Sequence, residues 1–373
     1  MDFSFTEEQE LLIDSARRYV AERYGFAARR QIVQSAEGWS RPVWRDFAEL
    51  GLLGLGVPEA DGGIGGGAVE TMLLSTVIGE GLVVEPYLSS AVLATRAIAR
   101  LGSDTQRSDW LPKLAAGAIV AVPVLDTTYE RGRAGAVRAS EAGEGWTLDG
   151  EMQVVYHAPL ADLFLVGAAT GAAAKGPDAL FAVPAGADGV ALRPYTTVDG
   201  QRAADVSFAG VRVGTAARLG NDARDELDAL VDFGLFALCS EAIGALDRCL
   251  AATVEYTRTR NQFGGPIARF QVLQHRMVDM LMRVEQARSL VYLAASRCDE
   301  SDAVERESAL SAAKVLVGEA ARFVGQQAVQ LHGGMGVSDE VAISHYFKRL
   351  LATEIRFGTA AAHLARFERH RLP

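Results

Sequence analysis

The spacing of apolar residues changes twice along this chain of 373 residues, and that change constrains the fold more than any other feature. Apolar side chains recur at helical spacing in the first part of the chain and again from Asp225 onward. Between Ile119 and Val213, short apolar runs alternate with turns rich in glycine, aspartate and proline, which is typical of strands. This order predicts an α+β protein. We expect a helical domain at 1–118, a small β-barrel or sandwich domain at 119–215 and a four-helix bundle at 216–373.

Local signals give several of these elements their ends. Thr6, with a glutamine three residues later, forms a capping box ahead of an apolar helix. A second helix over Pro42–Leu50 is expected to end at Gly51, and the glycine-rich stretch Pro58–Glu70 predicts a loop. Helical spacing then resumes from Val69 to Leu101. Further strands are expected at 119–125, 163–166, 179–183 and 204–208, and further helices at 225–259, 270–298, 303–331 and 338–356.

Charge and cysteine content exclude several classes of function. Lysine and arginine number 37 and aspartate and glutamate 47, so the net charge is −10. Such an acidic chain is a poor candidate for binding nucleic acid or anionic membranes. The three cysteines lack metal-ligand or CxxC spacing, which indicates no metal site and a reducing compartment. Without a secretory leader or a long uninterrupted apolar run, we expect a soluble, cytoplasmic protein with no membrane insertion.

Two sequence blocks carry side chains suited to a nucleotide. The first is RTRNQFGGPIARFQVLQHRMVDM from Arg258 to Met280, and the second is QLHGGMGVSDE from Gln330 to Glu340. Arg260 offers a planar fork of donors to a pyrophosphate, and Phe263 offers a ring face to an adenine. Gln271 can hydrogen-bond a base or ribose edge, while Gly333 and Gly334 let the backbone and its N–H groups approach a phosphate. Taken singly, each residue has an ordinary structural explanation, such as a core phenylalanine or a helix C-cap.

Both blocks resemble signatures of the acyl-CoA dehydrogenase family, in the same order and at a similar separation. FTEEQ (Phe5–Gln9), ELGLLGL (Glu49–Leu55), PEADGG (Pro58–Gly63) and the segment Val198–Val213 are also similar to it, so the resemblance covers nearly the whole chain. It implies the family fold, an acyl-CoA substrate, FAD, and an electron-transferring flavoprotein as partner. In the family, these blocks hold the ADP part of the FAD of a neighbouring subunit. The implied cofactor-binding residues are Arg260, Gln262, Phe263, Gln271, Gln330, Gly333, Gly334 and Thr359.

The catalytic base of the family is missing from its usual position. The family's Y-E-G-T motif corresponds here to Arg356-Phe357-Gly358-Thr359, so Phe357 replaces the glutamate that removes the substrate α-proton. Some members carry the base on the first helix of the C-terminal domain, which corresponds to Gly234. Glu241 and Glu354 lie close enough in sequence to be displaced bases, although a structural role is favoured for both. Asp232 lies two residues before Gly234 and is expected to face elsewhere.

The segments that cradle the flavin ring within one subunit are also altered. The family's T-E-P-x-A-G-S-D loop corresponds to Leu125–Arg133, and its G-x-K-x-W-I-T segment corresponds to Gly150–His157. The tryptophan of the latter is replaced by a valine at 154 or 155, and Ala361 stands where the family has a glutamine for the cofactor. Residues for this chain's own flavin are therefore lost together, whereas residues for a neighbour's flavin are kept.

This division predicts a subunit of an α₂β₂ acyl-CoA dehydrogenase that donates ADP-binding residues to its partner. The opening of the chain and the stretch Trp39–Leu55 resemble small subunits of bacterial pimeloyl-CoA-type enzymes, and related two-subunit enzymes act on steroid side-chain thioesters. A bulky or dicarboxylic acyl-CoA is the expected substrate. Three alternatives stay open: a self-sufficient homotetramer with a displaced base, a non-catalytic or regulatory acyl-CoA-binding protein, and a flavin enzyme with different chemistry, such as oxidation by O₂.

Overall fold

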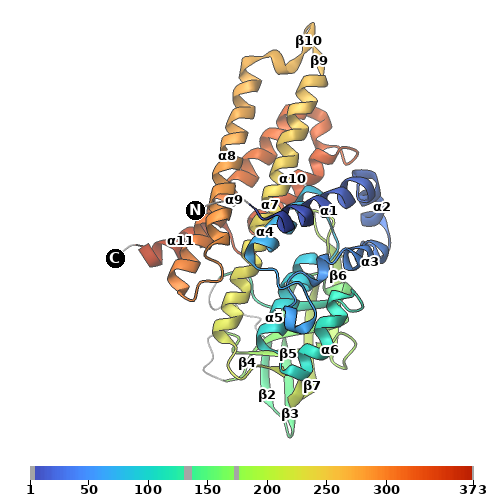
Figure 1. Ribbon diagram of the computed structural model, residues 1–373, viewed down its shortest axis with the longest axis vertical. Helices are drawn as coiled ribbons and strands as arrows, with labels where there is room; N and C mark the ends of the chain where they lie inside the picture. Colours follow the sequence, from blue (N-terminus) through green and yellow to red (C-terminus); the bar gives the residue numbers. More distant parts are fainter. Residues whose placement is uncertain (1–4, 130–136, 172–175, 372–373) are drawn as a thin grey trace. The chain divides into compact units, whose positions relative to one another are not determined.

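The computed structural model describes residues 5–129, 137–171 and 176–371. The chain divides into two compact units. Unit 1 contains Met1–Arg30, Met72–Val83 and Leu235–Pro373, and unit 2 contains Gln31–Thr71 and Val84–Gly234. Unit 1 is built mainly of helices, whereas unit 2 contains the main sheet together with several short helices (Figure 1). The domain bounds at 118 and 215 stay predictions.

The N-terminal part of the chain is helical, as predicted. Its helices are α1 (Glu7–Arg23), α2 (Phe26–Gln34), α3 (Arg41–Glu49), α4 (Ala68–Glu80), the π-helix η3 (Tyr87–Ala94), α5 (Thr95–Leu101) and α6 (Asp104–Ala115). The predicted capping box at Thr6 is present, and α3 ends one residue before Leu50. The helical stretch predicted from Val69 to Leu101 is interrupted after α4, where Gly81 ends the helix and Leu82 takes a left-handed φ of 51°. Proline at 86 prevents the helix from continuing unbroken.

The strands of unit 2 form one eight-stranded sheet in the order β6-β7-β3-β2-β4-β5-β8, with β1 parallel to β4. They are β1 (Ala121–Val124), β2 (Val137–Glu141), β3 (Gly145–Tyr156), β4 (Leu163–Ala169), β5 (Ala179–Pro184), β6 (Val190–Thr196), β7 (Arg202–Gly214) and β8 (Arg218–Leu219). The predicted strands correspond to β1, β4, β5 and β7. The others were not predicted because most of their side chains are exposed or half-buried, as in β6, and so leave no apolar run.

The long C-terminal helices match the predicted ranges closely. They are α7 (Arg224–Thr259), α8 (Gln271–Ala295), α9 (Ala303–His332) and α10 (Ala342–Ile355), followed by α11 (Ala360–Arg371), which was not predicted. Helix α9 packs against α8, α10 and α11. Within the described residues, α7 alone contains a window apolar enough to cross a membrane. Because 89% of that window is buried, it is the core helix of a folded protein.

Helices α4 and α7 cross within unit 1 at two glycines. A Cβ added at Gly79 would lie 1.8 Å from the backbone oxygen of Glu241, and one added at Gly244 would lie 1.9 Å from that of Thr76. A side chain at either position would therefore force the two backbones apart.

The C-terminal end of α4 is fixed by buried side chains from distant helices. Tyr346 Oη donates to the Glu80 carbonyl at 2.6 Å, Arg29 Nε to the Leu82 carbonyl at 2.7 Å, and Arg349 Nη2 to the Val83 carbonyl at 3.1 Å. The first donor satisfies a carbonyl group that the helix end leaves unpaired, and the other two satisfy carbonyl groups of the segment that follows α4. Through these hydrogen bonds, α10, which follows the second nucleotide block, is held against the N-terminal helices of unit 1.

Candidate functional site

The first nucleotide block forms an exposed hairpin between α7 and α8, at one end of the bundle (Figure 1). Strands β9 (Asn261–Gln262) and β10 (Gly265–Pro266) pair antiparallel around a two-residue turn, Phe263-Gly264. Both turn residues have positive φ, 53° and 83°, as a type I′ turn requires. Glycine takes this conformation freely, but phenylalanine does not, so Phe263 is strained as well as 81% exposed.

The second block begins where α9 ends. Gly333 has φ 60° and ψ −139°, a combination that only glycine adopts readily. Its N–H donates to the Gln330 carbonyl, so this amide closes the helix end, and its donation to a phosphate stays a prediction. A Cβ added at Gly333 or Gly334 would meet nothing within 4 Å. The backbone here is therefore open to the approach of a ligand from outside.

Tyr256 and His332 bring the two blocks together. Their rings stack with centroids 4.3 Å apart, and Tyr256 Oη donates to the His332 carbonyl at 3.3 Å. Tyr256 lies in the last turn of α7, four residues before Arg260, and His332 directly precedes Gly333. Burial lowers the pKa of His332, which keeps the ring neutral in this stack. Sequence reasoning missed both residues, although the four-residue spacing from Tyr256 to Arg260 was a usable signal.

The side chains around this contact fit the ADP part of FAD in their chemistry. Arg260, Gln262, Phe263, Gln271 and Gln330 are all exposed. Together they provide a guanidinium, three amide groups and an aromatic face, which are the groups that pyrophosphate, ribose and adenine require. Thr359, predicted to join this set, has a different local role. Its Oγ1 accepts a hydrogen bond from the Ala362 N–H at 3.3 Å at the start of α11.

Phe357 lies in a buried turn that two side chains hold in place. The turn has φ values of 54° at Phe357 and 83° at Gly358. His363 Nε2 lies 2.6 Å from the Phe357 carbonyl oxygen, and Lys314 Nζ donates to the carbonyls of Thr353 and Arg356 at 2.5 and 2.7 Å. Burial lowers the pKa of His363 to about 4 and that of Lys314 to about 8. A neutral histidine and a largely charged lysine therefore hold the turn at neutral pH.

Both glutamates considered as displaced bases are paired with arginines. Glu241 Oε1 lies 2.5 Å from Arg349 Nη1, and both side chains are buried. Glu354 forms a two-pronged ion pair with Arg322. Each carboxylate thus has a structural partner, as the sequence analysis favoured.

The position predicted to be an alternative base site has no carboxylate of its own, because it is Gly234. Two residues earlier, Asp232 is buried and accepts a hydrogen bond from Tyr129 Oη at 2.9 Å. Asp232 is thus also held by a neighbouring side chain.

The segment that corresponds to the family's tryptophan has a positive φ, which is unusual for valine. Val154 has φ 55° at a bulge in β3 and is exposed, whereas Val155 is buried. Asp205 Oδ1 accepts from the Val154 N–H at 3.1 Å and from Tyr195 Oη at 2.9 Å, and the carboxylate also pairs with Arg193. The bond to Arg193 lowers the pKa of Asp205. Val154 therefore occupies the outward position, but it offers no aromatic surface for a flavin. In the loop Leu125–Arg133, residues 130–133 lie outside the described residues.

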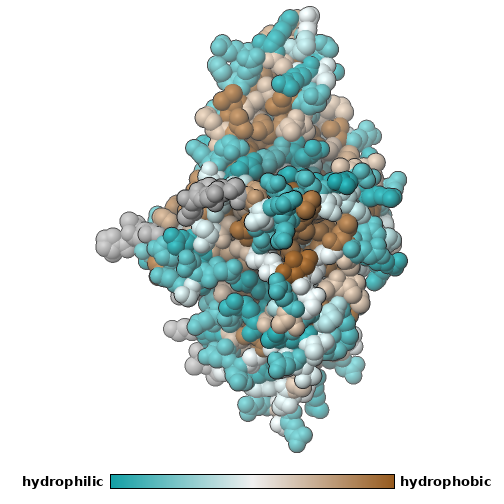
Figure 2. Space-filling view, viewed as in Figure 1, coloured by the Kyte–Doolittle hydropathy of each residue, from teal (hydrophilic) through white to brown (hydrophobic). Residues whose placement is uncertain are grey.

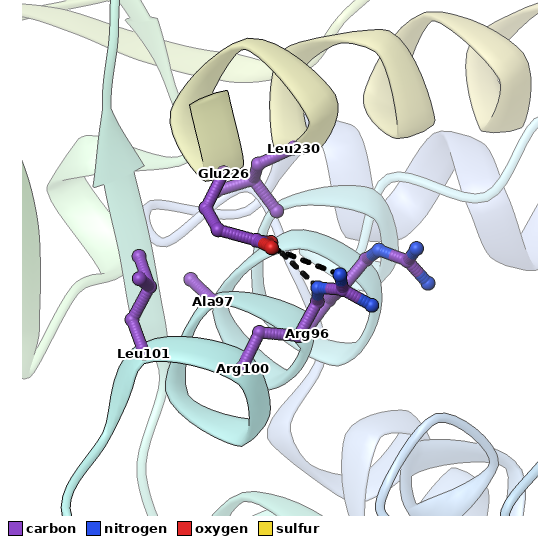
Figure 3. Close-up of a pocket in the computed structure, with 6 residues that line it drawn as sticks. All are labelled: Arg96, Ala97, Arg100, Leu101, Glu226 and Leu230. Atoms are coloured by element: carbon purple, nitrogen blue, oxygen red, sulfur yellow. Dashed lines mark hydrogen bonds and ion pairs between the residues drawn. The ribbon is translucent and has the colours of Figure 1, made fainter. Parts of the chain in front are cut away.

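A pocket in unit 2 lies between α5 and the start of α7 (Figure 3). Its lining residues are Arg96, Ala97, Arg100, Leu101, Glu226 and Leu230. Arg100 donates from Nε and Nη2 to Glu226 at 2.6 and 2.9 Å, and the third charged residue, Arg96, lies over the Phe233 ring. Across the described part of the chain, no group of three or more His, Cys, Asp or Glu side chains is placed to hold a metal ion.

Comparison with known proteins relates the chain to one family over most of its length. Residues 6–118 match the N-terminal domain of acyl-CoA dehydrogenases, and residues 230–371 match their C-terminal domain. Acyl-CoA dehydrogenase FadE27 of Mycobacterium tuberculosis is 32% identical, covering 99% of this chain and 98% of that protein. The structure is similar to a chain of the ChsE4–ChsE5 complex of Mycobacterium tuberculosis (TM-score 0.92, 31% identity, all of both chains). It is also similar to Tcur3481–Tcur3483, a steroid ACAD (TM-score 0.88, 28% identity, 98% and 97% of the chains).

Proposed function

The chain belongs to the acyl-CoA dehydrogenase family of FAD-dependent oxidoreductases, and on this premise we propose that it is one subunit of a heteromeric acyl-CoA dehydrogenase. In this proposal the chain supplies ADP-binding residues to the flavin site of a partner subunit of the same fold. The partner carries the catalytic base. A bound FAD would supply the hydride acceptor for the acyl-CoA thioester, and an electron-transferring flavoprotein would be the partner that receives the electrons.

The exposure of the hairpin turn is the observation that carries this proposal. Phe263 is an apolar residue in a strained conformation, and 81% of it faces solvent. An exposed apolar side chain with an unfavourable φ does not stabilise the isolated chain. A ligand that binds to the outside of the bundle explains why it is there. Arg260 and Gln262, beside it, are exposed as well. These side chains are expected to hold the adenine and pyrophosphate of a flavin whose ring lies in another subunit.

The residues at and near the family's base position also support a site in which the partner subunit supplies the catalytic base. Removal of the substrate α-proton needs a carboxylate that is free to accept it. Phe357 cannot accept a proton, and Glu241 and Glu354 are each engaged by an arginine. Restoring a carboxylate by Phe357→Glu is therefore not expected to make the chain active alone, because Val154 still offers the flavin ring no aromatic support.

The surface of α8 supports assembly with another subunit. Val272, Val278, Leu281 and Met282 are exposed apolar residues on this helix. Figure 2 shows apolar surface over the part of α8 near the hairpin. Exposed apolar patches of this kind mark protein–protein interfaces. Because Gln271 opens the same helix, a partner seated on α8 would lie beside the ADP-binding residues.

The proposed substrate is the thioester of a bulky acyl group. The similarity to a steroid ACAD, at 28% identity over nearly the whole chain, supports this choice. The similarity to a chain of the ChsE4–ChsE5 complex supports the heteromeric arrangement. A self-sufficient homotetramer is the main alternative, and it differs in a measurable way because every chain would hold its own FAD.

Co-expression with the partner subunit allows a direct test of the ADP-binding role. Arg260→Ala removes a charge-assisted contact to pyrophosphate, so we expect the complex to bind FAD about 10-fold more weakly. Arg297→Ala is the matched control, since Arg297 is a half-exposed arginine that pairs with Glu300 just beyond the other end of α8. Flavin content and affinity equal to wild type in a folded, assembled Arg260→Ala complex would show that the trans-site proposal is wrong.

A further inference from the structure

The loop that follows Gly334 is fastened to α10 through Asp339. The Asp339 carbonyl oxygen lies 3.0 Å from His345 Nε2, and its carboxylate lies 2.5 Å from Lys348 Nζ. His345 and Lys348 are both in the first two turns of α10. Asp339 belongs to the second nucleotide block, so the conformation of this block depends on contacts made by α10.

Arg29 determines which nitrogen of His345 carries the proton. Arg29 is buried in α2, where its Nε donates to the Leu82 carbonyl and its Nη1 lies 3.1 Å from His345 Nδ1. A guanidinium group can only donate hydrogen bonds, so Nδ1 must be the acceptor. The proton then resides on Nε2, which can donate to the Asp339 carbonyl. The edge-to-face contact with Phe26, with centroids 5.0 Å apart, holds the ring in this orientation.

Protonation of His345 would break this arrangement. A second proton on Nδ1 would point at the Arg29 guanidinium, so the hydrogen bond would become a repulsion between like charges. Burial, followed by the charges of Arg29 and Lys348, lowers the pKa of His345, while the Asp339 carbonyl and carboxylate act in the opposite direction. Arg30, on α2, interacts with the Asp339 carboxylate. The neutral ring is thus the form that connects α2 to the loop.

We propose that Arg29 and His345 form a positioning relay that holds the loop 335–341, and with it Gly333 and Gly334, in the conformation that binds the FAD pyrophosphate. The relay rests on the proposed ADP-binding function and extends it to residues that do not touch the cofactor. It also makes FAD binding sensitive to acid, because the relay requires a neutral His345.

Hydrogen exchange in the co-expressed complex tests the relay without reference to activity. His345→Phe keeps a ring against Phe26 but loses both polar contacts, and we expect the amides of residues 333–341 to exchange about 10-fold faster. The comparison is with Arg260→Ala, which also lowers FAD occupancy but leaves the relay intact. Exchange no faster in His345→Phe than in Arg260→Ala would overturn the proposal. His370→Phe, on α11, controls for the loss of a histidine.

FAD titration at two pH values provides the second measurement. The wild-type complex should lose about 10-fold in FAD affinity as the pH falls from 7.5 to below the ordinary histidine pKa of about 6.5 and His345 becomes protonated. His345→Phe should bind weakly at both values, with a smaller dependence on pH. The relay would be refuted, and the ADP-binding role would stand, if His345→Phe bound FAD with wild-type affinity and pH dependence while Arg260→Ala bound it more weakly. Unchanged binding in Arg260→Ala would instead refute the ADP-binding role, while hydrogen exchange would still report on the relay.

Discussion

Two phenylalanine-glycine turns in this chain have nearly the same positive φ values but differ in how much of the phenylalanine is buried. Phe263-Gly264 has φ values of 53° and 83°, and Phe357-Gly358 has 54° and 83°. The first turn is at the tip of a hairpin with its phenylalanine 81% exposed, and the second is buried with its phenylalanine 6% exposed. Both phenylalanines therefore have a φ that is unfavourable for their side chain, but only the second is held by packing within the chain.

This difference in burial indicates that the two turns have different roles. Packing and the contacts of Lys314 and His363 can maintain the Phe357 turn in the isolated chain. The Phe263 turn has few such contacts, apart from an edge-to-face contact with Phe270 and a bond from Arg269 to the Phe263 carbonyl. Strain that the chain does not compensate itself points to a partner or ligand. In the proposed function, the buried turn keeps the shape of a lost base site, and the exposed turn binds a neighbour's cofactor.

Truncation of the buried phenylalanine should have the largest effect on stability. Phe357→Ala removes a buried ring, and we expect it to lower the free energy of unfolding by about 3–5 kcal/mol. Urea denaturation followed by circular dichroism measures the change. A loss below about 1 kcal/mol would contradict the view that packing holds this turn.

Acid should weaken the same turn through His363. Its pKa is lowered to about 4 by burial, whereas in the unfolded chain it is about 6.5. Stability from the neutral ring is therefore complete above about pH 6.5 and is lost as the pH falls toward 4, by roughly 3 kcal/mol in total. His363→Gln should remove this part of the pH dependence. Denaturation midpoints at several pH values test it, and parallel curves for both proteins would exclude His363 as the source.

Truncation of the exposed phenylalanine should have the smallest effect on stability. Phe263→Ala removes a ring that is mostly in solvent and relieves a strained side chain, so the free energy of unfolding should stay within about 0.5 kcal/mol of wild type. FAD retention in the co-expressed complex should nevertheless fall, because the adenine loses its stacking surface. A stability loss as large as that of Phe357→Ala would mean that the two turns do not differ in the way described.

The fold was largely predictable because the long helices have clear apolar periodicity. Helices α7 to α10 were predicted to within a few residues, as were the strands β1, β4 and β5 with their continuous apolar runs. Exposed strands such as β6 leave no comparable pattern. Helix α11 was missed because its polar and charged residues conceal its few buried ones, among them His363.

The candidate site was only partly predictable. The resemblance supplied Arg260, Phe263 and the glycine pair. It could not show that the Gly333 amide closes a helix, because that depends on the local φ and ψ values. The contacts of Tyr256 with His332 and of Arg29 with His345 join residues 76 and 316 positions apart. Such pairs follow from the tertiary structure, and nothing in local propensity indicates them.

The ratio of FAD to protein tests the central claim most directly. The co-expressed complex should contain one FAD for each pair made of this chain and its partner, measured by flavin absorbance after denaturation and by quantification of both chains. This chain expressed alone should be colourless or hold far less than one FAD per chain, because its own cradle lacks the aromatic surface and the base-bearing residue. One tightly bound FAD per chain in protein expressed without the partner would contradict the account.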